Sequence, residues 1–359
     1  MKRITRAVRC GDVKIGGGYP VSIQSMTNTD TADIERTVEQ IQRLAEAGCE
    51  IVRVAVPNEA SACALNKIKQ ACTLPIVADI HFDYRLALSA IENGADKIRI
   101  NPGNIGSRER LKQIYEKAAA YHIPIRIGVN AGSLEKSMIE RFGGVNAEAM
   151  CESACQAVAF ARESGFSDIV VSIKSSDVRM NHDVHLLFAD RSDVPLHIGL
   201  TEAGIGESAK VKSAIAVGAL LLQGIGDTMR ISLTGDPVQE VLFAKEILRA
   251  AGNRTGGIDF ISCPTCGRTQ VDLQSIAMRI RKDIEPLSQS LADRGMSLKV
   301  AVMGCEVNGP GEAAYADIGV ACGKDKGLIF LKGKPLKTVT ENEIASELIQ
   351  LIQKIELAK

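Results

Sequence analysis

Short runs rich in Val and Ile recur along the first 250 residues and alternate with segments of helical period. The eight runs are Pro20 to Met26, Glu50 to Pro57, Leu74 to Ile80, Asp96 to Pro102, Ile123 to Asn130, Asp168 to Lys174, Pro195 to Thr201 and Thr228 to Thr234. The segments between them, such as Arg108 to His122, place apolar residues at the spacing of an amphipathic helix. Eight strands alternating with helices predict an α/β protein, with a parallel (β/α)8 TIM-type barrel over residues 1–250.

Polar side chains gather at or just past the carboxyl ends of these runs. They are Gln24, Asn28, Arg53, Asp79, His81, Arg99, Asn101, Asn104, Arg126, Asn130, Ser172, Lys174, His197, Thr201, Glu202, Arg230 and Ser232. In such a barrel the carboxyl ends of the strands form one rim, which carries the active site. One inward polar residue can merely fill the core, but so many at one rim indicate a binding site. Of the five histidines only His81 and His197 end strands, and the other three are expected on the surface.

After a polar, Gly-rich linker at 251–257 the order of elements changes. The pattern predicts strands at 258–262, 297–303, 316–322 and 327–333, a long helix within 271–294, and a final helix from Glu341. Strands and helices in this order favour a separate, smaller α+β domain over residues 258–359.

Three cysteines of this second domain follow predicted strands. Cys263 and Cys266 form a Cys-Pro-Thr-Cys motif, and Cys305 comes 38 residues after Cys266. A zinc ribbon needs a second Cys-x2-Cys pair, which the sequence lacks, and a thioredoxin-type motif leaves Cys305 unexplained. Three thiolates at strand ends are typical of an iron-sulfur site.

Two residues compete for the fourth ligand position of such a site. Cys322 would complete an all-cysteine set, whereas Glu312, in a predicted flexible loop of sequence NGPGEA, would supply an oxygen. Spacing alone favours Cys322, because thiolates are the usual ligands. The remaining cysteines are expected to be buried thiols; they are Cys10, Cys49, Cys63, Cys72, Cys151 and Cys155.

Composition narrows the choice of partners. Lys and Arg together number 43, as do Asp and Glu, and no basic cluster is interleaved with aromatic residues, so nucleic acid is excluded as a partner. Phosphate recognition would have to come from a few convergent Arg and Lys side chains. The amino-terminus lacks an apolar signal region and no run of about 18 apolar residues occurs, so a cytoplasmic protein without membrane contact is expected.

Eight motifs carry a resemblance to a known family. They are VSIQSMTNTDT, VADIHFDYRLAL, RINPGNIG, PIRIGVNAGSLEK, LTEAG, GIGDTMRISL, CPTCGR and GCEVNGPGEA. In these the sequence resembles the bacterial 4-hydroxy-3-methylbut-2-enyl diphosphate synthases of the methylerythritol phosphate route to isoprenoids. The resemblance implies an iron-sulfur oxidoreductase that opens 2-C-methyl-D-erythritol 2,4-cyclodiphosphate, with ferredoxin or flavodoxin as electron donor. It also implies a 4Fe-4S cluster on Cys263, Cys266, Cys305 and Glu312, which reverses the preference for Cys322.

The rim residues suit this chemistry. Guanidinium groups bind phosphate oxygens in pairs, so a compact cyclic diphosphate fits cations that converge from several strands. The expected substrate-binding residues are Arg53, Arg99, Asn101, Arg126, Asn130, Lys174, His197, Arg230 and Ser232. Expulsion of a hydroxyl needs an acid, for which Glu202 is the first candidate and Asp79 and His81 are the next. Glu312 is a weaker iron ligand than a thiolate and can make way for a substrate alkoxide.

The linker also predicts how chains assemble. The helix after the eighth strand ends at the bottom of a barrel, opposite the rim. Eight extended residues, Ala251 to Ile258, reach at most about 28 Å, which is short for a path to the opposite rim. A head-to-tail homodimer, with each cluster domain capping the partner's barrel, would solve this, and the family resemblance implies the same arrangement.

Two other functions remain open from the residues alone. One is a non-catalytic iron-sulfur or zinc regulator whose barrel binds a phosphorylated metabolite. The other is a metal-independent barrel lyase with a structural zinc domain. Metal content and turnover distinguish the three.

Overall fold

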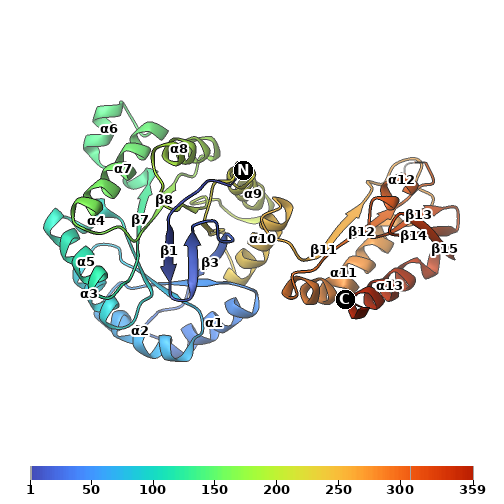
Figure 1. Ribbon diagram of the computed structural model, residues 1–359, viewed down its shortest axis with the longest axis horizontal. Coiled ribbons are helices and arrows are strands. Elements are labelled where there is room, and N and C mark those ends of the chain that lie inside the picture. Colours follow the sequence, from blue (N-terminus) through green and yellow to red (C-terminus); the bar gives the residue numbers. More distant parts are fainter. Residues whose placement is uncertain (1, 308, 359) are drawn as a thin grey trace. The chain divides into compact units, whose positions relative to one another are not determined.

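The computed structural model describes residues 2–307 and 309–358 and divides into two compact units, Met1–Arg254 and Thr255–Lys359. The first unit contains all eight predicted strands in one parallel sheet, with helices around it (Figure 1). The strands are β3 (Ser22–Met26), β4 (Ile51–Ala55), β5 (Ile76–Asp79), β6 (Lys97–Ile100), β7 (Ile125–Asn130), β8 (Ile169–Lys174), β9 (His197–Ile198) and β10 (Thr228–Met229). Their order is β8-β7-β6-β5-β4-β3-β10-β9, and a bridge between Val171 and Leu196 closes the ring. The predicted TIM-type barrel is confirmed.

The barrel helices begin where the sequence supplies caps. Asp33, Asn58 and Asp177 are examples, since each side chain accepts a hydrogen bond from a backbone N–H of the first helical turn. The helices are α1 (Ile34–Glu46), α2 (Glu59–Ala71), α3 (Tyr84–Glu92), α4 (Pro102–Ile105), α5 (Arg108–Ala120), α6 (Lys136–Phe142), α7 (Ala147–Glu163), α8 (Val178–Arg191), α9 (Gly206–Leu222) and α10 (Pro237–Ala250). They bury apolar faces against the outside of the sheet and hold each strand end in place.

A hairpin of β1 (Ala7–Cys10) and β2 (Val13–Gly16) precedes the barrel and was not predicted. Its residues Val8, Cys10 and Ile15 pack against residues at the amino ends of β4, β5 and β8, where Ile51 begins β4. The hairpin therefore covers the bottom of the barrel, and the opposite rim holds the candidate site.

The second unit is a five-stranded mixed sheet in the order β11-β12-β13-β14-β15. Its elements are β11 (Gly257–Ser262), α11 (Leu273–Asp293), β12 (Ser297–Met303), α12 (Gly309–Ala314), β13 (Ile318–Gly323), β14 (Lys326–Leu331), β15 (Lys334–Thr340) and α13 (Ile344–Ala358). Val300 and Val302 share a core with α11 and α13, whereas Ala301 and Met303 face a second core with Ala313 of α12. The alternation of a strand thus puts helices on both faces.

Several expectations were wrong in detail. The segment expected as a flexible loop forms the short helix α12, which carries Glu312, because Pro310 and the two alanines after Glu312 suit a first helical turn; Asn308 lies outside the described residues. Strand β15 was not predicted. His185, expected on the surface, is buried, and Cys63, expected inside, is exposed. In the described part of the chain, no helix is long and apolar enough to cross a membrane.

Candidate active site

Four barrel strands bring cations together, although Arg126 is the second residue of its strand and does not lie at the carboxyl end, where the sequence placed it. Arg53 lies in β4, Arg99 in β6, Arg126 in β7 and Lys174 at the end of β8. The register places Arg99 beside Asp79 on one side and Arg126 on the other. Only 2% of Arg126 is exposed, and Lys174 is also buried. The structure thus brings together four of the five cations that the sequence predicted to bind substrate.

Asp79 is the centre of an ion-pair network at this rim. Its Oδ1 lies 3.1 Å from Arg99 Nη1, and its Oδ2 lies 3.2 Å from Arg53 Nη2 and 3.3 Å from His81 Nε2. Burial raises the pKa of Asp79, but the charges of Arg53 and Arg99 outweigh it and bring the pKa to about 2. Asp79 is therefore ionised at neutral pH.

A second carboxylate holds Arg230, which follows β10. Glu240 of α10 is buried, and its Oε2 lies 3.5 Å from Arg230 Nε and accepts a hydrogen bond of 3.3 Å from Ser25 Oγ. Its Oε1 accepts a 2.9 Å bond from the backbone N–H of Leu233, which fixes the loop after β10. Sequence reasoning missed Glu240, because a glutamate in the first turn of a helix is usually exposed to solvent.

Cations outnumber carboxylates in this group. Five cations face two carboxylates, Asp79 and Glu240. Burial, followed by the like charges of its neighbours, lowers the pKa of Arg126 and of Lys174, and burial above all lowers the pKa of Arg53 to about 10. Within the described residues the buried Nε and Nη1 of Arg126 and the Nε of Arg53 and of Arg99 have no hydrogen-bond partner. Buried cations in this state are stabilised by a bound anion with several oxygens.

Two glycines leave the room that these cations occupy. A Cβ at Gly128 would lie 3.0 Å from Nε of Arg99, and one at Gly199 would lie 2.9 Å from Nζ of Lys174 and 2.4 Å from the carbonyl oxygen of Arg230. Both sit in strand segments that the sequence predicted without giving these glycines a role.

The proton-donor candidates differ in their surroundings. His81 is exposed and contacts Asp79, whereas Glu202 is exposed at the rim with a φ of +54°. Positive φ in a residue other than glycine costs about 1 to 3 kcal/mol and clusters at active sites. Within the described residues, Glu202 forms no ion pair.

The other expected binding residues lie at different depths. Asn101 Nδ2 donates to Ser133 Oγ at 2.9 Å, and Asn130 and Ser232 are half-buried. His197 was expected at the end of a strand. It instead begins β9, because this strand has only two residues, and it is fully buried. Burial, then the charges of Arg126 and Lys174, lowers the pKa of His197, so it is neutral beside the cation group.

In the second unit, three thiols follow neighbouring strands. Strands β11 and β12 are parallel neighbours, with Ser262 paired to Val302. Cys263 and Cys305 therefore both lie just past the carboxyl ends of these strands. The backbone N–H of Gly304 donates to Cys263 Sγ at 3.2 Å. A Cβ at position 304 would lie 2.9 Å from side-chain carbons of Thr269 and Leu273, so a larger residue there would force these side chains to move.

Cys266 lies in a turn closed by Thr269, whose N–H donates to the Cys266 carbonyl at 2.9 Å. Hydrogen bonds from the backbone and side chain of Arg268 lower the pKa of the Cys266 thiol, and Arg268 also interacts electrostatically with Cys305. A lowered pKa favours the thiolate, which is the form that binds iron.

The fourth-ligand candidates differ sharply. Cys322 lies in β13, is fully buried in the apolar core, and burial raises the pKa of its thiol to about 12. Glu312 is exposed in α12, the helix that follows Cys305. A carboxylate in water is the more accessible ligand of the two.

Over residues 2–307 and 309–358, no three His, Cys, Asp or Glu side chains form a group that could hold a metal ion. The donor set nevertheless fits an iron-sulfur cluster in its chemistry. Three thiols share one sheet edge, a backbone N–H points at one sulfur, and an arginine favours the thiolate of another.

Comparison with known proteins covers both units. Residues 5–245 match the GcpE TIM-barrel domain and residues 259–354 match the GcpE protein C-terminal domain. The chain is 53% identical over 355 residues to the 4-hydroxy-3-methylbut-2-en-1-yl diphosphate synthase (flavodoxin) of Caldanaerobacter subterraneus subsp. tengcongensis, covering 99% of this chain and 98% of that one. It is 52% identical over 354 residues to the protein of the same name from Clostridium perfringens, covering 99% of each.

Among solved structures, Yersinia pestis DHPS with a pterine-sulfa conjugate has a TM-score of 0.50 at 10% identity, covering 69% of this chain and 98% of that one. This likeness concerns the fold alone.

Proposed function

The chain belongs to the GcpE family, and from that membership we propose that it reductively opens and dehydrates 2-C-methyl-D-erythritol 2,4-cyclodiphosphate to 4-hydroxy-3-methylbut-2-enyl diphosphate. Its relatives carry the name 4-hydroxy-3-methylbut-2-en-1-yl diphosphate synthase (flavodoxin), which makes flavodoxin the electron donor in this proposal. The chain is accordingly an oxidoreductase of isoprenoid biosynthesis.

The observation that carries the proposal is the excess of buried cations at the barrel rim. Arg53, Arg99, Arg126 and Lys174 present guanidinium and ammonium groups from four strands. In the described residues, buried nitrogens of the three arginines lack hydrogen-bond partners. A cyclic diphosphate is a compact dianion whose oxygens satisfy such donors. In the same proposal, Asn101, Asn130, His197, Arg230 and Ser232 complete the substrate pocket.

The rim residues divide into holding and proton-transfer roles. Asp79, with a pKa of about 2, is ionised at neutral pH and holds Arg53 and Arg99. Glu202, exposed at the rim in a strained conformation, is the proposed proton donor to the departing hydroxyl. His81, paired with Asp79, is the alternative donor.

We assign residues 258–359 to a 4Fe-4S cluster held by Cys263, Cys266, Cys305 and Glu312, and residues 1–250 to substrate binding, with 251–257 as linker. When bound, such a cluster supplies electrons singly, which no side chain does. Glu312 would be the weakest donor of the set, because a carboxylate binds the iron of such a cluster less tightly than a thiolate does. Cys322 stays in the apolar core and takes no part.

Anaerobic purification with measurement of iron, sulfide and zinc tests the proposal first. Turnover of the cyclic diphosphate with dithionite, followed by phosphorus NMR, tests it second. A colourless protein that holds zinc without iron contradicts the proposal and supports a lyase with a structural metal. An iron-sulfur protein that binds the cyclic diphosphate without converting it supports a regulator.

A further inference from the structure

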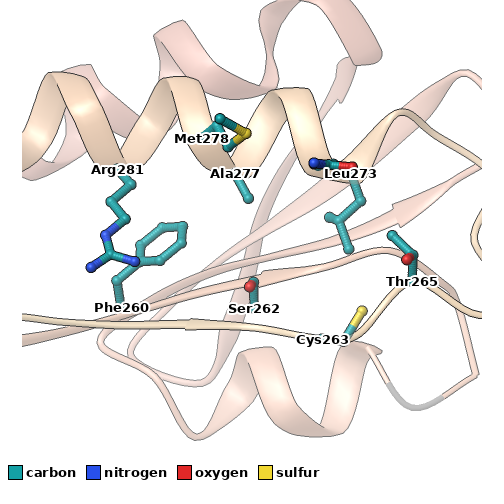
Figure 2. A pocket seen from close by; sticks show the side chains of 9 residues that line it. Phe260, Ser262, Cys263, Thr265, Leu273, Ala277, Met278 and Arg281 are labelled. Carbon is teal, nitrogen blue, oxygen red and sulfur yellow. The ribbon is translucent and has the colours of Figure 1, made fainter. Parts of the chain in front are cut away.

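A groove of about 310 Å³ runs along the second unit between the end of β11 and one face of α11 (Figure 2). Phe260, Cys263 and Thr265 line it from the strand side, and Met278 and Arg281 line it from the helix. Figure 2 shows these side chains around one hollow, with Cys263 at the end nearest Leu273. The groove therefore includes the side chain of a proposed cluster ligand.

The groove is about equally polar and apolar and is open to water. Met278 is 64% exposed, and Phe260 is half-buried beside Arg281. Strand β11 is also the edge of its sheet, with β12 as its neighbour on one side. Exposed methionines and aromatic residues around a hollow are typical of protein-docking surfaces, where they supply most of the binding energy.

The groove is also positively charged. Arg281 is the one charged residue among those that line it, and it forms no ion pair within the described residues. Arg268, which interacts electrostatically with Cys266 and Cys305, adds a second positive charge near the thiols. A partly apolar surface with exposed cations fits a partner with an acidic rim around an apolar centre.

We propose that this groove is the docking site of the electron donor, a small acidic protein whose redox cofactor exposes an apolar edge, as flavodoxin does. This inference rests on the proposed function, because it takes Cys263 as a cluster ligand. The donor's cofactor would sit against Phe260 and Met278, its carboxylates would pair with Arg281 and Arg268, and electrons would enter beside Cys263. The barrel rim of a second chain carries an excess of cations, which would repel Arg281, so we assign that rim to another face of the cluster unit than this groove.

The charge reversal Arg281→Glu tests the proposal on the iron-sulfur holoenzyme. Turnover is measured twice, with reduced flavodoxin at varied concentration and with dithionite, which needs no docking site. We expect the half-saturating flavodoxin concentration to rise about tenfold and to lose part of its salt dependence, since rim charges steer association. Dithionite-driven turnover and iron content are expected to stay at wild-type values.

Arg279→Glu is the matched control. Arg279 is exposed on the same helix, about 200° around the axis from Arg281, and does not line the groove. The same change in net charge at Arg279 is expected to alter flavodoxin dependence less than twofold. Met278→Asp tests the apolar part and is expected to weaken flavodoxin binding as Arg281→Glu does.

Calorimetric titration of the holoenzyme with flavodoxin separates this proposal from the proposed function, because binding is measured without turnover. Equal affinities of the wild type and Arg281→Glu, or equal effects of Arg281→Glu and Arg279→Glu, overturn the docking site. Loss of dithionite-driven turnover in an iron-replete Arg281→Glu protein also overturns it, because the groove would then serve the reaction itself. A wild type that binds flavodoxin through Arg281 but converts no substrate keeps the docking site and refutes the proposed function.

Discussion

Asp79→Asn removes the carboxylate that balances the buried arginines of the barrel rim while keeping the shape of the side chain. In the wild type, Asp79 lies 3.1 Å from Arg99 and 3.2 Å from Arg53 and is almost fully buried. The amide has no charge, so both guanidinium groups would stay buried with less compensation. We expect the variant barrel to be less stable when no anion is bound.

The pKa of Asp79 gives the magnitude. The interval between 3.8, the ordinary value, and about 2 in the folded protein corresponds to about 2.4 kcal/mol of stability at 1.36 kcal/mol per pH unit. Because the folded chain binds this proton more weakly than the unfolded chain, the stabilisation is complete above the ordinary pKa and is lost as the pH falls towards 2. The difference between wild type and variant is therefore expected to be about 2 kcal/mol at pH 7 and about half of that at pH 3.

Urea unfolding followed by tyrosine fluorescence measures this difference. The chain has no Trp, and four of its five tyrosines lie in the barrel unit, so the signal reports mainly on the barrel. Asp193→Asn is the matched control, because Asp193 pairs with Arg6 and Arg162 at the surface, where such pairs contribute about 0 to 1 kcal/mol. Inorganic pyrophosphate is expected to stabilise Asp79→Asn more than the wild type, since the anion replaces the lost charge. A variant as stable as the wild type at pH 7, or one that gains no more than the wild type from pyrophosphate, refutes this reasoning.

Five further substitutions, in three groups, test the assignment of roles. Arg126→Ala and Lys174→Ala are expected to raise KM for the cyclic diphosphate at least tenfold with iron content unchanged, and loss of iron would contradict the division of labour between the units. Cys305→Ser is expected to lose its iron and all activity, whereas Cys322→Ala keeps both; a colourless Cys322→Ala protein would restore the all-cysteine ligand set. Glu202→Gln is expected to lower kcat about 100-fold with KM nearly unchanged, because a general acid acts in the transition state, and an unchanged kcat would exclude Glu202 as proton donor.

The barrel could be predicted from the sequence because its strands are buried on both sides. Such strands appear as continuous Val and Ile runs, which are easy to separate from amphipathic helices. The hairpin of β1 and β2 was not predicted, because each strand has only four residues and a charged residue, Arg9 or Lys14, interrupts the apolar pattern. Helix α12 was mistaken for a loop because Gly309, Pro310 and Gly311 open it, and these residues usually mark turns.

The candidate site could be predicted in part. Arg53, Arg99 and Arg126 were found because a charged side chain is rarely buried without a partner, so its presence inside an apolar strand indicates a rim site. Glu240 was not found, because its burial depends on Arg230 and Leu233 from the preceding loop, and no local pattern encodes that contact. The choice between Cys322 and Glu312 likewise depended on tertiary burial, since spacing alone pointed to the residue that lies in the core.

The last prediction concerns assembly and starts from Arg254, the final residue of the barrel unit. Its Nη2 donates to the carbonyl oxygen of Val21 at 3.2 Å and pairs with Glu50, and these residues precede β3 and β4. The chain is thus tied to the bottom of its own barrel. Gly256 already bonds to Ser297 Oγ at 2.8 Å in the second unit, so Thr255 is the one residue between the two anchors.

We expect this tether to be too short for a chain to complete its own site. From the bottom of the barrel, a path to the rim runs the length of α10, about 21 Å, and then about 10 Å inward across the helix layer. From the tether to Cys263, strand β11 spans six residues, about 20 Å. We therefore propose a homodimer in which each cluster unit serves the partner's barrel.

Mixing Cys305→Ala subunits with Arg126→Ala subunits tests the homodimer at a substrate concentration near the wild-type KM, where Cys305→Ala alone is expected to be inactive and Arg126→Ala alone to be nearly inactive because of its raised KM. With random exchange about half of the dimers are mixed, and each mixed dimer has one site with both an intact barrel and an intact cluster unit. About a quarter of wild-type activity should therefore return. Sites built within one chain would regain nothing on mixing, because every chain carries one defect, and that result would exclude the shared site.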